Sequence, residues 1–63
     1  MKQEMKISDF VKILPPHMRI EVISLGHYRE TGKDDVKDIR LDYPDERVYS
    51  VRQDRDGIAV LTR

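Results

Sequence analysis

Histidines and carboxylates are the residues in this sequence that could support metal or acid–base chemistry. The two histidines, His17 and His27, lie ten residues apart, and the chain contains no cysteine. Metal sites usually contain ligands that are only about two to five residues apart in the sequence. The ten-residue spacing of the two histidines therefore predicts no metal centre. We expect His17 at a proline corner and His27 at the end of a strand, and we expect no bound cofactor.

Catalysis is not predicted from the remaining reactive side chains either. The three serines have no base at a recognisable spacing: Ser8, Ser24 and Ser50. Two pairs of adjacent carboxylates occur, but acid–base catalysis needs carboxylates that a cleft desolvates, and a chain of 63 residues can hardly enclose a cleft. The three glycines are too isolated to build a phosphate-binding loop. The sequence therefore predicts a non-enzymatic protein.

Tyrosine and arginine side chains offer a binding chemistry instead. Tyr28, Tyr43 and Tyr49 have arginines nearby and could stack on the bases of single-stranded nucleic acid. Phosphate binding needs an uncompensated basic track, however, and the 12 basic residues are balanced by 12 acidic ones. The same residue types are enriched at the energetic centres of protein interfaces. We therefore predict a protein partner, with nucleic acid as the alternative.

The acidic residues gather in the middle of the chain. Residues 30–46 contain seven acids and three bases, a net charge of −4, while the segments before and after them each carry +2. This part is either an ordinary solvated hairpin or a surface that meets a basic partner. The partner contacts are predicted at its acidic and aromatic positions: Asp34, Asp35, Asp42, Tyr43, Asp45 and Glu46.

Length and composition bound the architecture. A chain of 63 residues without cysteine forms one domain, residues 1–63, with a thin core that no disulfide supports. Such a protein often self-associates, and an uncovered strand edge is the simplest route, so a homodimer is expected. The chain has no apolar run that resembles a signal peptide or a membrane span, so the expected location is the cytoplasm.

The elements that would position these residues follow from hydrophobic periodicity. A short helix is predicted over residues 7–14, with Ser8 as its N-cap and with Phe10, Ile13 and Leu14 on one side. Pro15 ends it. A strand follows over residues 19–25, where a change of apolar face indicates a bulge or burial on both sides.

The second half of the chain reads as strands and turns. After a turn at residues 30–33, residues 34–38 are either one helical turn or the start of a strand that runs to Tyr43. Residues 47–51 and 58–62 are two more strands, and Gly57 closes the turn between them in a left-handed conformation. The predicted fold is α+β, with a short N-terminal helix packed on a three- to four-stranded antiparallel meander.

These segments together resemble a known group of proteins. The capped helix at 7–14, the proline corner, and the segments 19–23, 46–51 and 56–61 are similar to short, mostly uncharacterised proteins encoded by phages and prophages of Gram-positive bacteria. The acidic middle departs from that pattern. The resemblance implies a mobile-element protein that binds a host protein or complex, for example as an inhibitor of an anti-phage defence system. It assigns no site residues.

Overall fold

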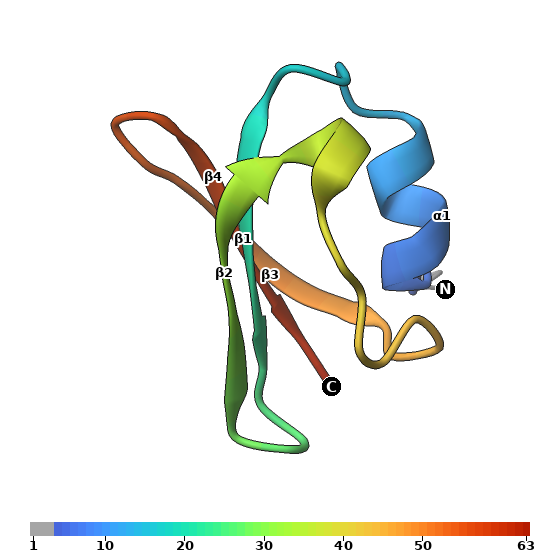
Figure 1. The fold of residues 1–63 in the computed structure, drawn as a ribbon. Coiled ribbons are helices and arrows are strands. Elements are labelled where there is room, and N and C mark those ends of the chain that lie inside the picture. The colour runs from blue at the N-terminus through green and yellow to red at the C-terminus, as the bar shows by residue number, and fades with distance from the viewer. Residues whose placement is uncertain (1–3) are drawn as a thin grey trace.

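The fold is α+β, as predicted, and consists of one helix and a four-stranded sheet (Figure 1). The computed structural model describes residues 4–63. In chain order the elements are α1 (Ile7–Lys12), β1 (Arg19–Ser24), β2 (Arg29–Asp35), the 3₁₀ helix η1 (Val36–Asp38), β3 (Val48–Gln53) and β4 (Gly57–Thr62). No helix within the described part of the chain is long and apolar enough to cross a membrane.

The sheet is mixed, so the predicted antiparallel meander is wrong. Its strand order is β2-β1-β4-β3, and β1 pairs with β2 and β4 with β3 as antiparallel hairpins. The two hairpins meet through β1 and β4, which run parallel from Arg19 beside Gly57 to Ser24 beside Thr62. A parallel pair needs a long connection, and residues 36–47 supply it by crossing one face of the sheet (Figure 1).

The connection between η1 and β3, residues 39–47, is called the crossing segment below. The strand predicted up to Tyr43 is wrong, because residues 39–43 belong to no strand of the sheet. Arg47, at the end of the segment, bridges to Lys6 and exchanges two backbone hydrogen bonds with Arg63. The alternation of residues 39–43 has a different cause, since Ile39 and Leu41 pack against the core while their neighbours face outward. The turn predicted at residues 30–33 is also wrong, because these residues belong to β2 and the chain turns at residues 25–28.

Helix α1 begins at Ile7, as predicted, but it ends at Lys12, two residues before the predicted end, and its N-cap and exposed face differ from the prediction. Its N-cap is Lys6 and not the predicted Ser8, and no side chain caps the helix. The start is fixed by tertiary contact, because Ile7 is buried and its N–H donates to the Glu46 carbonyl at 2.8 Å. Ile13 was expected on the buried side but is 68% exposed, while Phe10 and Leu14 pack against the core.

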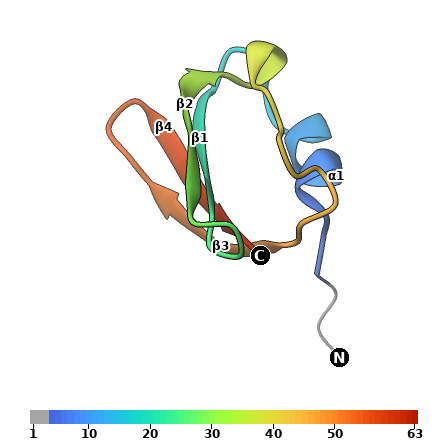
Figure 2. The same ribbon diagram turned by 60° about the horizontal axis from the view of Figure 1, so that its bottom comes forward.

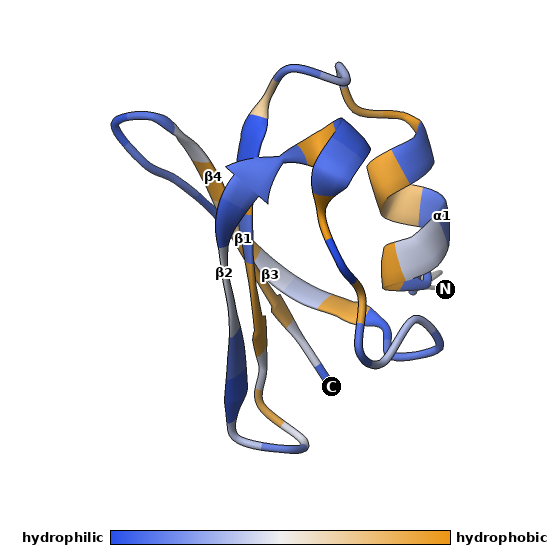
Figure 3. Ribbon diagram, in the orientation of Figure 1, coloured by the Kyte–Doolittle hydropathy of each residue, from blue (hydrophilic) through white to orange (hydrophobic). Residues whose placement is uncertain are grey.

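The core lies between the sheet and a layer formed by α1 and the crossing segment. Its fully enclosed aliphatic side chains are Ile7, Ile20, Val22 and Val60. Figure 2 shows the sheet on one side and the second layer on the other, and Figure 3 shows hydrophobic positions along both layers. Residues of both layers pack against the core, for example Phe10 and Leu41 from the second layer and Ile58 from the sheet. The opposite face of the sheet has no covering layer among residues 4–63 (Figure 2).

Gly57 joins the two hairpins closely. The predicted left-handed conformation is wrong, because no glycine in the described part of the chain has a positive φ. Glycine is required for a different reason: a Cβ at this position would collide with the backbone oxygen of Arg19. The close approach of Arg19 and Gly57, the first residues of the parallel pair, therefore requires a residue without a side chain at position 57.

Candidate functional site

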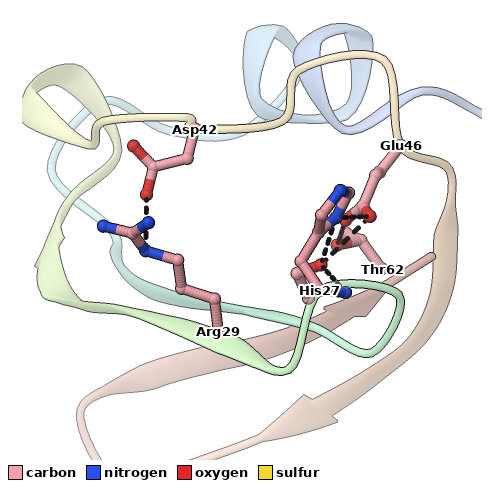
Figure 4. Close-up of polar contacts among 6 residues, drawn as sticks. His27, Arg29, Asp42, Glu46 and Thr62 are labelled. Carbon is pink, nitrogen blue, oxygen red and sulfur yellow. Dashed lines mark hydrogen bonds and ion pairs between the residues drawn. The ribbon is translucent and has the colours of Figure 1, made fainter.

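Four polar residues meet where β1 and β4 end, and they are called the polar cluster below: Ser24, His27, Glu46 and Thr62 (Figure 4). The parallel register places Ser24 beside Thr62. Glu46, from the crossing segment, accepts a hydrogen bond from Thr62 Oγ1 at 2.7 Å through Oε1. Its Oε2 accepts from Ser24 Oγ at 3.0 Å and from His27 Nδ1 at 2.8 Å. One carboxylate thus ties together both central strands, the β1–β2 turn and the crossing segment.

The carboxylate of Glu46 is charged at neutral pH. Its side chain is only 11% exposed, and this burial raises its pKa. The hydrogen bonds from Thr62, Ser24 and His27 outweigh burial and hold the pKa of Glu46 below the ordinary glutamate value. Because a carboxylate can only accept, Nδ1 of His27 carries the proton, and Nε2 is the acceptor in the neutral ring.

A stacked pair and an ion pair flank the polar cluster. The His27 ring lies flat against Tyr43, with a centroid distance of 3.6 Å and an interplanar angle of 3°. On the neighbouring strand, Arg29 Nε lies 3.5 Å from Asp42 Oδ2 (Figure 4). Both contacts join the β1–β2 hairpin to the crossing segment. The imidazole is therefore held by hydrogen bonds at its edge and by a ring against its face.

The polar cluster contains serine, histidine and glutamate, but their geometry differs from that of a hydrolytic triad. Ser24 Oγ lies 3.3 Å from His27 Nδ1, the same nitrogen that contacts Glu46. A triad places the acid and the serine on opposite ring nitrogens, so that the histidine relays between them. Ser24 is also buried and donates to Glu46. The hollow beside the cluster measures about 10 Å³, room for roughly one water molecule.

The six residues predicted as partner contacts do not form one surface. Asp34 and Asp35 end β2, whereas the other four lie in the crossing segment. Asp42 contacts Arg29 at the start of β2, and a seven-residue strand extends for roughly 20 Å. The structure therefore separates the predicted set into two groups at opposite ends of β2.

The members of the crossing-segment group differ in accessibility. Glu46 is engaged in the polar cluster, and Tyr43 is covered on one face by His27. Asp42 and Asp45 are exposed, and Asp45 lies 3.8 Å from Lys6. Only the two aspartates of this group are thus presented to solvent. Within residues 4–63, no group of three or more His, Asp or Glu side chains is arranged to hold a metal ion.

Tyr28 was considered from the sequence only for nucleic-acid stacking and was not among the predicted partner contacts. It lies at the tip of the β1–β2 hairpin, its side chain is 94% exposed, and its backbone is left-handed with φ 53°. The other tyrosines are partly covered, Tyr43 by His27 and Tyr49 by the Arg63 guanidinium, whose Cζ lies 4.2 Å from the ring centroid. The three rings form no common stacking platform, and no sequence signal indicates a left-handed tyrosine.

No protein-family model, curated protein or solved structure matches this chain. Its function therefore has to be inferred from the geometry of its own residues.

Proposed function

We propose that this chain is a small non-enzymatic module that binds another protein, with Tyr28 as the central contact. The observation that carries this proposal is the combination of 94% exposure with a left-handed backbone at an aromatic residue. A non-glycine residue in this conformation costs about 1 kcal/mol or more. Because the ring is almost entirely exposed, packing within residues 4–63 does not offset this strain energy.

Strained residues that display a side chain outward are concentrated at functional sites. Tyrosine is also among the residues that contribute most binding energy at protein interfaces. A contact of this kind needs no cavity, which agrees with the water-sized hollow beside the polar cluster. A protein surface is therefore a better match for Tyr28 than a small molecule.

The polar cluster supports the proposal by holding the hairpin tip in place. The backbone N–H of His27 donates to Ser24 Oγ at 3.1 Å, and the His27 side chain is fixed by Glu46 and Tyr43. Tyr28 follows His27 directly. Because these contacts hold the neighbouring residue before binding, less conformational entropy of the hairpin tip is lost when a partner immobilises the tyrosine.

The class of partner comes from the resemblance described above. Proteins of phage and prophage origin bind host machinery, so we propose a bacterial host protein as the partner and inhibition of a defence protein as the outcome. The homodimer predicted from the sequence remains a separate proposal, which light scattering measures. The nucleic-acid alternative gains no support from the separated tyrosines.

The substitution Tyr28→Asn tests the proposal, because asparagine tolerates the left-handed conformation but lacks the ring. We expect the free energy of unfolding in urea to stay equal or rise by up to about 1 kcal/mol. Immobilised wild-type protein should capture a bacterial protein at stoichiometric level, and the variant should not. Ile13→Ser, at another exposed apolar residue, is the matched control and should still capture it.

Two results contradict the proposal. One is a wild-type protein that captures nothing at stoichiometric level from host lysate. The other is a Tyr28→Asn variant that is as stable as the wild type and still captures the same partner.

A further inference from the structure

The two edges of the sheet differ in how well they are protected. Strand β2 forms one edge and is almost entirely polar, with a register shift between Ile20 and Val22 on its partner β1. Charges and irregularities of this kind discourage pairing with another strand. Strand β3 forms the other edge and carries Val48, Tyr49 and Val51. It has β-forming side chains and a less charged sequence, so β3 is the edge more open to a further strand.

The open part of this edge lies in the second half of β3. Asp54 N–H donates to the Gly57 carbonyl at 2.7 Å, and Gln53 pairs with Ile58 and Arg52 with Ala59. Along an antiparallel ladder, hydrogen-bonded residue pairs alternate with pairs that are not hydrogen-bonded. Asp54 is hydrogen-bonded to Gly57, so the alternate residues Gln53 and Val51 point their N–H and C=O groups away from β4.

The first half of the same edge is covered by the chain itself. Val48 N–H donates to the Met5 carbonyl at 2.8 Å, and an isolated bridge joins Lys6 to Arg47. Among residues 4–63, this pairing stops before Val51. Within that range the outward backbone groups of Val51 and Gln53 have no partner, and they are open to an incoming strand whose path along β3 is bounded by the Met5–Lys6 end.

An apolar groove runs beside this open edge. It has a volume of about 750 Å³ and lies between the proline corner and the β3–β4 hairpin. Its apolar lining comes from Pro15, Met18, Val51 and Ile58, and Val51 is 45% exposed. A side chain on the inner face of an added strand would enter this groove. The edge thus offers hydrogen bonds and a place for an apolar side chain together.

We propose that the β3 edge binds an extended segment of a partner protein as an added antiparallel strand. The segment carries an apolar residue opposite Val51 and an acidic residue opposite Arg52. Residues directly opposite each other share a face of the sheet. Arg52 is exposed, lies on the uncovered face with Ala59, and makes no ion pair within residues 4–63, so a carboxylate across from it completes the pair.

A second copy of this chain fits the edge less well. The antiparallel β3–β3 register that satisfies the outward groups of Val51 and Gln53 places Arg52 directly opposite Arg52 of the copy. Like charges in this position are destabilising. A second β3–β3 register places Val51 opposite Val51 of the copy and therefore Gln53 opposite Tyr49. This register is also less suitable, because the β3–β4 ladder is irregular at Tyr49. The charge of Arg52 therefore favours an acidic partner segment.

This surface goes beyond the proposed function of Tyr28 and does not depend on it. Arg19 and Ser24 mark the two ends of the parallel pair, and the β1–β2 tip follows Ser24 while the β3–β4 turn lies beside Arg19. Figure 1 shows the two hairpin tips pointing in different directions. A failure of the Tyr28 experiment and a failure of the edge-binding experiment are thus separate results.

The test uses the acetylated peptide Thr-Val-Glu-Val-Thr and isotope-labelled full-length protein, observed by NMR. We expect chemical-shift changes and slower hydrogen exchange at the Val51 and Gln53 amides. Replacing the peptide glutamate by lysine should weaken binding about two- to fivefold. Arg52→Glu, at an exposed position, should reverse this preference.

Backbone methylation of the peptide supplies a control that leaves the protein unchanged. Methylating the two valine nitrogens, which face β3, should abolish binding, whereas methylating the glutamate nitrogen, which faces away, should leave it intact. Shifts centred elsewhere, or equal binding of both methylated peptides, overturn the proposal. The proposal is also overturned if the Val51 and Gln53 amides exchange slowly without peptide and light scattering gives the mass of a dimer. Those two results would assign the β3 edge to a second copy of the chain.

Discussion

Glu46 is the residue at which three separated parts of the chain meet. Its partners Ser24 and His27 are 22 and 19 positions away in sequence, and Thr62 is 16 positions away. A buried carboxylate that accepts three hydrogen bonds stabilises the fold only while it is ionised and its donors remain in place. The stability of the whole domain is therefore linked to the protonation of this one side chain.

We predict that Glu46→Gln reduces the free energy of unfolding by roughly 1–3 kcal/mol at neutral pH, because buried hydroxyls lose a charged acceptor. The lowered pKa of Glu46 also gives the wild type a pH dependence. Its contribution is fully present above about pH 4.3, the value of an unperturbed glutamate, and is lost as the pH falls through the lowered folded-state pKa.

Urea unfolding of both proteins from about pH 7 to about pH 3 measures this difference. The gap in stability between wild type and variant should narrow with acid. A gap that stays constant over this range would show that the charge of Glu46 does not stabilise the fold.

The sequence indicated that Tyr43 and Glu46 matter, but for a different reason. They were predicted as partner contacts because they lie in an acidic, aromatic segment, and the structure places both in intramolecular contacts. The polar cluster could not be predicted, because its members come from three separated parts of the chain: the β1–β2 hairpin, the crossing segment and the end of β4. The parallel register that places Ser24 beside Thr62 has no local sequence signal. Whether any of the six predicted contact residues binds a partner stays a prediction.

At the level of elements, local signals predicted some elements and failed for others, and the long-range contacts had no signal. The β3–β4 hairpin and β1 follow from apolar alternation and turn residues, and the structure confirms them. Strand β2 has no apolar alternation, because it is an edge strand with polar residues on both faces. Residues 39–43 of the crossing segment have the apolar alternation of a strand but belong to no strand of the sheet. The parallel contact of β1 with β4 has no local sequence signal.

Gly57 is expected to be the most sensitive glycine in the sheet. We predict that Gly57→Ala costs about 2–3 kcal/mol, because the new methyl group meets the Arg19 carbonyl and separates β1 from β4. Gly32→Ala is the matched control, since nothing lies within 4 Å of the place its methyl group would take, and it should change stability by less than about 0.5 kcal/mol. Thermal unfolding by circular dichroism measures both. Equal melting temperatures for the Gly57→Ala and Gly32→Ala variants would contradict the close approach of Gly57 to the Arg19 backbone.

At the scale of the whole molecule, stability rests on very few side chains. A domain of 63 residues is expected to have a net stability of about 3–9 kcal/mol. The enclosed aliphatic core consists of Ile7, Ile20, Val22 and Val60, beneath one short helix and the crossing segment. Each of these residues therefore accounts for a large fraction of the total.

Ile20→Ala should remove about 2–5 kcal/mol, because Ile20 is completely buried between the sheet and the second layer. We expect a fall in melting temperature of at least about 10 °C, or a variant that is largely unfolded at room temperature. Ile13→Ala, at an exposed position of the same residue type, should shift the transition by only about 2 °C. Similar shifts for both variants would mean that the two layers do not pack as described.

The Met5–Lys6 segment also has a consequence for how the protein behaves in a preparation. Its backbone shields the beginning of β3, so a protease that trims the chain back to Ile7 would lengthen the bare strand at that side of the sheet. Longer bare edges template the growth of ordered aggregates. Samples clipped at this point should therefore lose solubility on storage while their circular dichroism spectra remain close to that of the intact protein.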